Sequence, residues 1–362
     1  MDQQQNNIYS TRASLISRKF ADYKIDSLFF FNTSNIFYLS GFSGSDGVLL
    51  LTPAKTILLI DGRYTTQALL QTKNMQIIEY KDKISGIIQS IRDFRLKKIG
   101  FESDQLTVDI YNKISSVFHK KIFVPLYDKL KLIRARKDKT EIALMKKAAS
   151  IASSAICGVL SEIRQGVTEK DLALQLEYSA RRLGADQVSF DPIVAFGKNS
   201  ALPHAKPTNK KVKKRDFIVI DFGVKYKGYC SDETCTVAFG ELIKKQRHAY
   251  QAVKIAQEAA LTCIKSNVEA SFVDRQARSI FGNKYGRYFV HGTGHGVGLE
   301  VHEAPRLASN SQDVLETNMV VTVEPGLYFP GQWGIRIEDT VLVKENCCEK
   351  LTKMDKELIV IE

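Results

Sequence analysis

Acidic side chains lie within apolar, strand-like segments in the C-terminal part of this chain. Asp221 lies inside the run DFIVIDFG, Glu324 ends the β-branched run VVTVE, and Glu338 lies within GIRIEDTVLV. A carboxylate buried among apolar residues is costly unless a positive charge or hydrogen bonds compensate it. Several such carboxylates in one part of the chain therefore indicate that they share a bound cation.

The spacing around Asp221 predicts a hairpin that brings a second acid, Asp232, beside it. Successive residues of a strand point to opposite faces, and a turn with the sequence KYKG follows the first strand. If that turn centres on Tyr226 and Lys227, Asp221 and Asp232 are directly opposed, with Cβ atoms ~4.5–5.5 Å apart. Two carboxylates at that spacing repel each other unless they share a proton or a cation. A pair exposed on an edge strand is the alternative, and the apolar neighbours argue against it.

Four of the six histidines lie in segments rich in glycine or proline. The run 289–298 (FVHGTGHGVG) has glycine at every second position from Gly292, which prevents a stable helix. It is therefore not a helical zinc-protease motif, and Pro305 excludes that motif after His302. A lone histidine usually packs in a core, but four in such contexts indicate a site. They are His204, His291, His295 and His302.

The candidate ligands also limit the kind of metal. Asp221, Asp232, Glu324 and Glu338, with a neutral His295, carry a charge of −4, which two divalent cations would neutralise. A set rich in oxygen with one nitrogen suits manganese, cobalt or iron better than a thiolate-rich zinc site. Two metals ~3.5–4 Å apart can share a hydroxide and act as Lewis acids on a carbonyl group.

The length of 362 residues predicts two domains. Strand and helix signals alternate at first, which predicts a small α/β domain over 1–130. The segment 131–138 is charged and has no apolar period, so we place a linker there, before an α+β domain over 139–362. The expected N-terminal strands are 27–31, 47–51, 56–60 and 98–101, and the expected helices are 64–71 and 108–118.

The second domain begins with helix signals. Asp138 and Glu141 form a capping-box pattern, and the apolar stripe that follows predicts a helix that Gly166 ends. Thr168 caps a second helix that runs to about Gly184. Further helices are expected near 243–265 and 271–281.

Composition excludes several classes of protein. At 44% hydrophobic and 25% charged residues the chain should fold. We find no apolar run of the ~18–20 residues that a membrane helix needs, and 1–10 is polar. The cysteines form no C-x-x-C pair. The net charge of +12 suggests nucleic acid, but the basic cluster 206–215 lacks interleaved aromatics and is interpreted as a solvated loop. We expect a cytoplasmic protein with neither nucleic-acid nor membrane partners.

Several motifs, spread over essentially the whole chain, are those of one known family. They are IDFGVKYKGYCSDET, HGTGHGVGLEVHE, TVEPGLY and GIRIED, with SNIFYLSGFSGSDGVLLL and DGRYTTQA nearer the N-terminus. They resemble the pita-bread metallopeptidases, in particular the branch of aminopeptidase P and prolidase. The resemblance implies an α+β fold, with a pita-bread catalytic domain and a smaller N-terminal α/β domain of the creatinase, ribonuclease H-like type.

The resemblance assigns a metal-binding role to each of the five candidate ligands. Asp221 would bind one metal ion, and Asp232 and Glu338 would bridge both. His295 and Glu324 would complete the second metal. Manganese is expected first, with cobalt, iron or zinc as alternatives.

The resemblance also implies residues that contact the substrate. Glu324 would transfer protons near a bridging hydroxide, and Arg336 would bind substrate. His204, His291 and His302 would hydrogen-bond the substrate and the tetrahedral intermediate, where a donor can contribute ~3–4 kcal/mol. Two positions depart from the family pattern. Cys235 stands where arginine is usual, and Trp333 stands where glycine is expected, so we expect an altered surrounding of the site or of the substrate pocket.

These features predict a metal-dependent exopeptidase that cleaves between an N-terminal residue and a following proline by a metal-bridging hydroxide. Proline has no N–H and a fixed φ, so a dedicated pocket is expected. The N-terminal motifs favour an Xaa-Pro aminopeptidase. An Xaa-Pro dipeptidase (prolidase) is the alternative, in which Arg306 would clamp the free carboxylate of a dipeptide unless a structural salt bridge holds it. A non-catalytic binding protein on the same fold is a further alternative. The resemblance also implies a homodimer.

Overall fold

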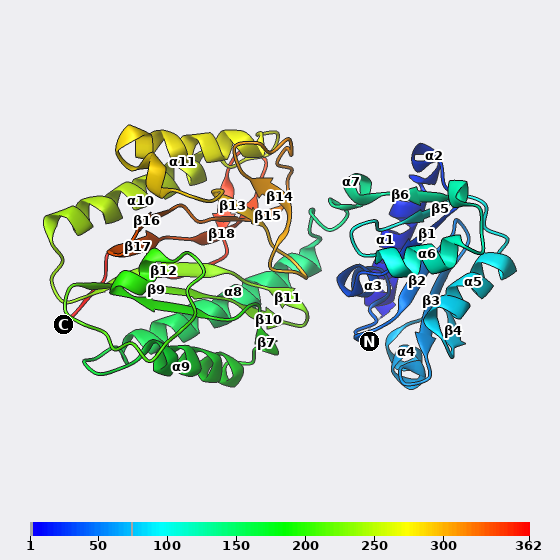
Figure 1. The fold of residues 1–362 in the computed structure, drawn as a ribbon, viewed down its shortest axis with the longest axis horizontal. Helices are drawn as coiled ribbons and strands as arrows, with labels where there is room; N and C mark the ends of the chain where they lie inside the picture. The colour runs from blue at the N-terminus through cyan, green and yellow to red at the C-terminus, as the bar shows by residue number, and fades with distance from the viewer. Residues whose placement is uncertain (1–2, 74) are drawn as a thin grey trace. The chain divides into compact units, whose positions relative to one another are not determined.

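The computed structural model describes residues 3–73 and 75–362 and divides the chain into two compact units, Met1–Ile133 and Arg134–Glu362. Figure 1 shows the elements of both units in chain order. Each unit has a hydrophobic core of its own.

The N-terminal unit is built on one mixed sheet with the strand order β4-β3-β2-β1-β5-β6. Its strands are β1 Ser27–Phe30, β2 Val48–Leu51, β3 Thr56–Asp61, β4 Gln76–Tyr80, β5 Ile99–Phe101 and β6 Phe123–Pro125. Its helices are α1 Gln3–Ser17, α2 Phe20–Tyr23, α3 Thr33–Ser40, α4 Thr65–Gln71, α5 Lys83–Asp93, α6 Val108–Ser115, η1 Lys120–Ile122 and α7 Tyr127–Leu130. The four strands predicted from apolar runs are confirmed to within one residue at each end.

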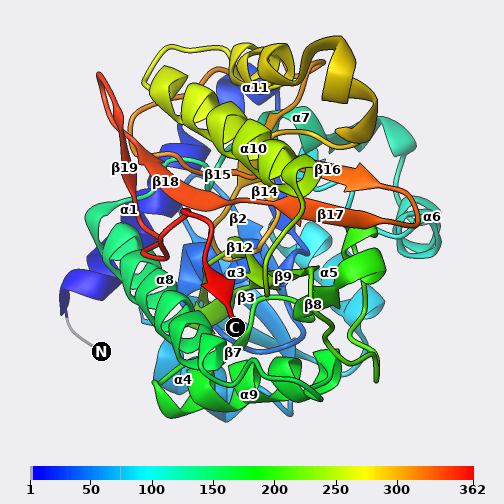
Figure 2. The same cartoon turned by 90° about the vertical axis from the view of Figure 1, so that its left-hand side faces the viewer.

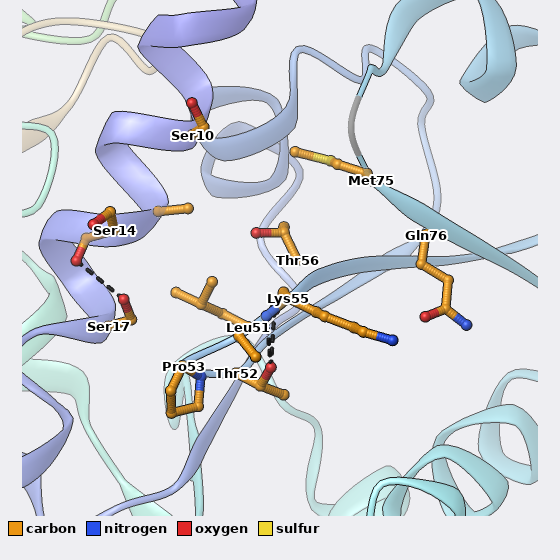
Figure 3. A pocket seen from close by; sticks show the side chains of 12 residues that line it. Ser10, Ser14, Ser17, Leu51, Thr52, Pro53, Lys55, Thr56, Met75 and Gln76 are labelled. Carbon is orange, nitrogen blue, oxygen red and sulfur yellow. Dashed lines mark hydrogen bonds between the residues drawn. The ribbon is translucent and has the colours of Figure 1, made fainter.

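A surface pocket of about 520 Å³ lies in the N-terminal unit, between α1 and the turn that joins β2 to β3. Figure 3 shows that hydroxyl side chains line much of it, among them Ser10, Ser14, Thr52 and Thr56. None of the candidate metal ligands belongs to this unit.

In the C-terminal unit two pairs of helices lie on opposite sides of the strands, as Figure 1 shows. The pairs are α8 Lys139–Leu160 with α9 Glu169–Arg182, and α10 Lys244–Cys263 with α11 Ala270–Tyr285. The remaining elements are β7 Gln187–Val188, β8 Ile193–Phe196, η2 Gly197–Ala201, β9 Asp216–Phe222, β10 Val224–Tyr226, β11 Tyr229–Cys230, β12 Glu233–Phe239, η3 Gly286–Tyr288, β13 Gly294–Gly296, β14 Glu303–Leu307, β15 Val320–Val323, β16 Gly326–Phe329, β17 Trp333–Arg336, β18 Asp339–Val343, β19 Cys348–Lys350 and β20 Val360–Ile361. One core lies against each helix pair.

Two larger sheets carry the residues of interest. One has the order β20-β12-β9-β8, and the other has the order β14-β13-β15-β18-β19. The candidate ligands lie in these two sheets or at the ends of their strands. A site between them therefore depends on contacts that join one sheet to the other.

The start of α8 is confirmed and its predicted end is wrong. Asp138 accepts from the backbone N–H of Glu141, and Glu141 accepts from that of Asp138, both at 2.9 Å. The helix ends at Leu160 rather than at Gly166. Ile163 is buried although it lies beyond the end of the helix, so it continued the apolar pattern from which the longer helix was predicted. By length and hydropathy α8 could cross a membrane, but it packs in a core against α9 and β10.

Candidate metal centre

The hairpin that carries Asp221 has a different register from the predicted one. Its turn centres on Lys227 and Gly228, whose φ angles of 49° and 86° are both positive. A two-residue turn of this kind favours glycine. Asp221 is therefore paired with Thr234, and direct opposition of Asp221 and Asp232 was wrong. Asp232 lies two residues before Thr234 and hence on the same face as Asp221, as a diagonal neighbour ~7–8 Å away in an ideal ladder.

We expected Glu338 in the middle of a strand, but it lies at a break between two strands. β17 ends at Arg336 and β18 begins at Asp339. The backbone N–H of Glu338 donates to Thr234 O at 3.1 Å, and the Thr234 hydroxyl donates to Glu338 Oε2 at 2.6 Å. Through these two bonds Glu338, which precedes β18 of one sheet, is joined to β12 of the other sheet.

His295 and Glu324 come together because β13 and β15 approach closely. A Cβ on Gly294 would lie 2.0 Å from Thr322 O, so only glycine fits there. The backbone N–H of His295 donates to the Thr322 hydroxyl at 3.0 Å. His295 Nε2 then lies 3.3 Å from Glu324 Oε1 and 3.7 Å from Asp232 Oδ2.

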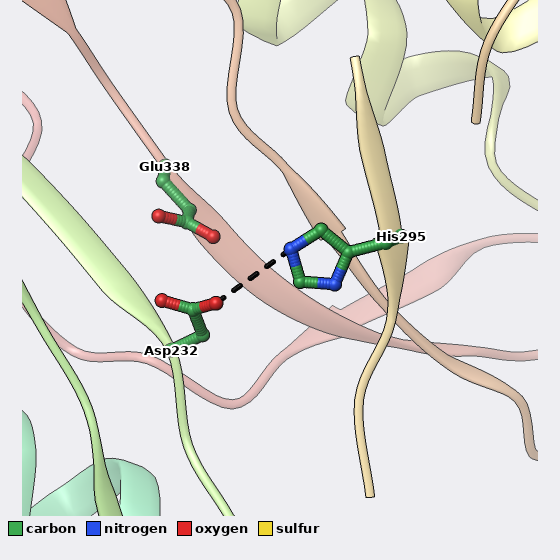
Figure 4. Close-up of side chains that lie close together, drawn as sticks. All are labelled: Asp232, His295 and Glu338. Atoms are coloured by element: carbon green, nitrogen blue, oxygen red, sulfur yellow. Dashed lines mark ion pairs between the residues drawn. The ribbon is translucent and has the colours of Figure 1, made fainter. Parts of the chain in front are cut away.

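The side chains of Asp232, His295 and Glu338 converge from three separate segments, as Figure 4 shows. One potential ligand atom from each lies within 4.8 Å of the others. Asp221 Oδ1 and Glu338 Oε1 are buried and have no hydrogen-bond partner among the described residues. Buried carboxylate oxygens normally have partners, so these two atoms fit a role as metal ligands.

The charges of the centre shift several pKa values. Burial and the neighbouring carboxylates raise the pKa of Asp232 and of Glu338 well above the usual range. Burial favours a higher pKa for Glu324, but that pKa is lowered to about 2, because the hydrogen bond and the charge of His295 outweigh the effect of burial. Conversely, burial lowers the pKa of His295, and Glu324 more than reverses this shift. The carboxylates thus crowd together as expected for ligands without their cation.

Arg336 contacts the candidate ligand Asp221 and makes its other bonds within the protein. It forms a buried ion pair with Asp221 and donates to the Tyr328 hydroxyl at 2.8 Å, the Thr234 hydroxyl at 3.2 Å and Pro203 O at 3.1 Å. It therefore fixes Asp221 and the segment before His204. Substrate binding by Arg336 stays a prediction.

Tyr328 is a site residue that we did not single out from the sequence, although it lies in the motif TVEPGLY. Its hydroxyl accepts from Arg336 and can then donate to His291 Nε2, 2.9 Å away. His291 Nδ1 is 2.7 Å from Gly292 O. This arrangement matches a neutral imidazole with its proton on Nδ1, and burial lowers the pKa of His291 accordingly. The sequence did contain a signal for this residue, because a tyrosine in an apolar strand is expected to need a hydrogen-bond partner for its hydroxyl.

The other two histidines lie closer to solvent. The His302 ring stands 4.4 Å from the His295 ring, centroid to centroid, at 68°. Burial, followed by the charge of His295, lowers the pKa of His302. His204 is exposed on the turn after η2, and its charge contributes to the lowered pKa of both His291 and His302. His204 therefore belongs to the rim of the same site.

The two departures from the family pattern both point away from the ligands. Cys235 is buried in the core against α8, and burial raises the pKa of its thiol to about 12. Trp333 packs between Phe329 and Phe217, at centroid distances of 4.2 and 5.5 Å. Trp333 therefore supports the core beneath α10 and does not line the site.

The charge of the centre suits two cations better than one. Four carboxylates and the Arg336 guanidinium leave a net charge of −3 when His295 is neutral. One divalent ion would leave −1, and two would leave +1, which a single hydroxide would cancel. Carboxylates and an imidazole around one point, with further histidines beside them, are typical of metal-dependent hydrolases.

The particular family follows from comparison with known proteins. The chain belongs to metallopeptidase family M24, which it matches over residues 143–345, and residues 12–136 match the creatinase/prolidase N-terminal domain. The family implies a dinuclear metal site. The resemblance read from the motifs, the α+β pita-bread fold and the assignment as a metallopeptidase are thereby confirmed. The non-catalytic alternative has no support, because all five candidate ligands are present.

Three relatives illustrate the similarity. The Xaa-Pro dipeptidase of Pyrococcus furiosus is 35% identical over 92% of this chain and 95% of that protein. The structure of an Xaa-Pro dipeptidase from Bacillus anthracis is 38% identical with a TM-score of 0.93, covering 98% of this chain and 100% of that one. The structure of an X-Pro aminopeptidase from Thermotoga maritima is 37% identical with a TM-score of 0.89, covering 96% and 99%.

Proposed function

We propose that this metallopeptidase is an Xaa-Pro dipeptidase, which releases a C-terminal proline from a dipeptide. The observation that carries the proposal is Arg306, whose backbone pairs with that of His295 across β13 and β14. Paired residues share one face, so Arg306 lies on the side of the metal centre. It is exposed and forms no ion pair with any residue in 3–73 or 75–362. A guanidinium so placed can bind the free carboxylate of a dipeptide through two N–H groups.

The comparisons favour the same choice over the aminopeptidase that the N-terminal motifs suggested. The match to the Bacillus anthracis dipeptidase covers 98% of this chain and so includes the N-terminal unit. Those motifs therefore do not distinguish the two activities. The Pyrococcus furiosus relative is also named an Xaa-Pro dipeptidase.

In the proposed mechanism each residue acts from the position described above. Two divalent ions would be held by Asp221, Asp232, His295, Glu324 and Glu338. Bound there, the ions would polarise the scissile carbonyl group and make water a stronger nucleophile. Glu324 accepts the proton of the attacking water. His302 orients the substrate and donates to the developing oxyanion, while His204 closes the rim of the site. A donor role for His291 requires that its ring release Gly292 O or Tyr328, which hold its two nitrogens.

An Xaa-Pro aminopeptidase is the second candidate, favoured by the similarity to the Thermotoga maritima enzyme. The dipeptide Ala-Pro and the tripeptide Ala-Pro-Ala separate the two, because only the dipeptide places a carboxylate on the proline itself. We expect kcat/KM for Ala-Pro to exceed that for Ala-Pro-Ala by at least ~10-fold, as the loss of one charge-assisted hydrogen bond predicts. Ala-Ala serves as the control without proline. A clear preference for the tripeptide would establish the aminopeptidase instead.

Arg306→Ala should raise KM for Ala-Pro by ~10–100-fold, since a hydrogen bond to a charged group contributes ~1.5–3 kcal/mol. KM for Ala-Pro-Ala should change little. The control is Arg164→Ala, because Arg164 is an exposed arginine paired with Glu162 on the turn after α8. Steady-state kinetics on both substrates measures the effect, and an unchanged KM for Ala-Pro would remove Arg306 from the mechanism.

Three further expectations are part of the proposal. We propose manganese as the metal because the ligand set is rich in oxygen with one nitrogen. We also propose a homodimer, as the resemblance implies, and a cytoplasmic location, as the composition suggests. Metal analysis of the purified protein and its mass in solution test the first two directly.

A further inference from the structure

A second group of charged residues is buried behind the candidate metal centre. Glu233 follows Asp232, and Asp339 follows Glu338. Because neighbouring residues in a strand point to opposite faces, each pair of acids places one carboxylate toward the metals and one away from them. Glu233 and Asp339 are 0% and 1% exposed.

Lys356 joins the two rear carboxylates. Its Nζ lies 2.6 Å from Glu233 Oε1 and 3.7 Å from Asp339 Oδ1. In the part of the chain that the structure describes, Lys356 is the cation in contact with Glu233. Asp339 has a second one in Lys350, whose side chain is 50% exposed and therefore screened by water. Cys235, on the same face of β12 as Glu233, carries no positive charge.

Other bonds hold these carboxylates in place. Glu233 accepts from the Ser153 hydroxyl and from the backbone N–H of Met354 at 3.0 Å. Asp339 accepts from Gln257 at 3.0 Å and from the Thr352 hydroxyl at 2.7 Å. Every rear oxygen thus has a partner within the protein.

Lys356 contacts residues of two different sheets, each adjacent in sequence to a candidate metal ligand. The strands β12 and β18 belong to different sheets, and a few individual bonds join them in place of a shared ladder, among them Thr234 to Glu338 and the Thr340 hydroxyl to Asp232 O. Lys356 comes from the segment after β19, which Figure 2 shows returning, in red, to β20 beside β12. The Tyr250 hydroxyl donates to Lys356 O at 3.1 Å and anchors the segment.

We propose that Lys356 is a positioning residue for the metal centre. By holding Glu233 and Asp339 together, it acts with the direct bonds of Thr234 and Thr340 to fix the distance between Asp232 and Glu338, two of the proposed metal ligands. Without its charge the two rear carboxylates repel each other in a medium of low dielectric constant, and the strands that carry the bridging ligands separate. This inference rests on the ligand set of the proposed function.

The test is Lys356→Met, with Mn²⁺ binding to the metal-free protein measured by calorimetry and the retained metal counted after dialysis. We expect ~10–100-fold weaker Mn²⁺ binding, the usual effect of removing a partner outside the first ligand shell. Saturating Mn²⁺ should restore kcat, and KM should not change because no substrate contact is lost. Lys254→Met is the control, since Lys254 contacts Glu357 of the same segment but neither rear carboxylate. It should bind Mn²⁺ as the wild type does.

The double variant Lys356→Met with Glu233→Gln separates charge from packing. It leaves the same space but removes the uncompensated carboxylate, so we expect it to recover most of the Mn²⁺ affinity. Lys356→Gln, which can still hydrogen-bond Glu233, provides a second uncharged variant if the methionine variant does not fold. Wild-type Mn²⁺ affinity in a folded Lys356 variant would overturn the positioning role, and so would a double variant as weak as the single one. Asp232→Asn tests the ligand set separately, because wild-type metal binding by that variant would contradict the proposed site itself.

Discussion

Asp232→Asn is expected to abolish retention of the metal ions and to lower kcat/KM for Xaa-Pro cleavage by ~10³-fold or more. Asparagine keeps the shape of the side chain but loses the charge, and Asp232 lies between His295 and Glu338 in the cluster of potential ligands. The loss of metal-assisted catalysis removes several kcal/mol of transition-state stabilisation, and each ~1.4 kcal/mol corresponds to a tenfold change in rate.

The measurement combines the metal content after dialysis with hydrolysis of Ala-Pro at saturating Mn²⁺. Glu162→Gln is the matched control, because Glu162 is an exposed acid paired with Arg164 in the same unit. It should keep both metal content and activity. A folded Asp232→Asn variant with full metal content and activity would show that the centre lies elsewhere.

The acids of the site could be predicted because burial of charge is a local signal. Asp221 and Glu338 each stand among apolar residues in a strand-like sequence, and both are buried in the structure. The same locality explains the capping box at Asp138, which needs only four consecutive residues. Signals of this kind place residues in a fold without giving the distances between them.

The register of the Asp221 hairpin could not be predicted from the apolar pattern alone. The sequence KYKG permits two centres for the turn, and they differ by one residue. Positive φ at Lys227 and Gly228 decides between them, and the shift moves the partner of Asp221 from Asp232 to Thr234. The actual arrangement leaves Asp221 and Asp232 on one face but no longer directly opposed, which reduces their repulsion when no metal is bound.

The support of the site is not local and therefore escaped prediction. Arg336 contacts Asp221, which is 115 residues away in the chain, and Lys356 contacts Glu233, which is 123 residues away. Tyr328, which lies in the separate two-stranded sheet of β16 and β17, contacts His291, which precedes β13. Such partners appear only when the sheets are assembled. In the N-terminal unit β4 and β6 were missed for a related reason, because both are edge strands with partly exposed residues.

Binding of Mn²⁺ is expected to release protons and to weaken as the pH falls. Burial, together with the neighbouring carboxylates, raises the pKa of Asp232 and Glu338 in the metal-free protein. Metal ions bind the ionised forms, so the ions must displace protons that these groups hold up to a higher pH than ordinary carboxyl groups do. Calorimetry in buffers of different ionisation enthalpy counts the released protons, and affinity that does not change between about pH 6 and pH 8 would contradict this account.

The same shifts predict how the stability of the metal-free protein depends on pH. A carboxyl group whose pKa is raised on folding binds its proton more tightly in the folded state than in the unfolded state, where the value is ~4. Stability therefore falls as the pH rises from ~4 toward the raised pKa values. In this range the unfolded state has already released the proton, whereas the folded state still binds it, so each rise in pH favours the unfolded state. Asp232→Asn removes one such group, so the metal-free variant should melt above the metal-free wild type at pH 8, with a difference that shrinks toward pH 5.

Metal ions should reverse that order. Mn²⁺ at 100 times its Kd stabilises the wild type by ~2.7 kcal/mol per site, whereas Asp232→Asn gains nothing. Thermal melting with Mn²⁺ or with a chelator, followed from about pH 5.5 to pH 8.5, distinguishes the two effects. If the metal-free variant melts below the wild type at every pH, Asp232 is stabilised by its own contacts and is not a ligand whose charge awaits a cation.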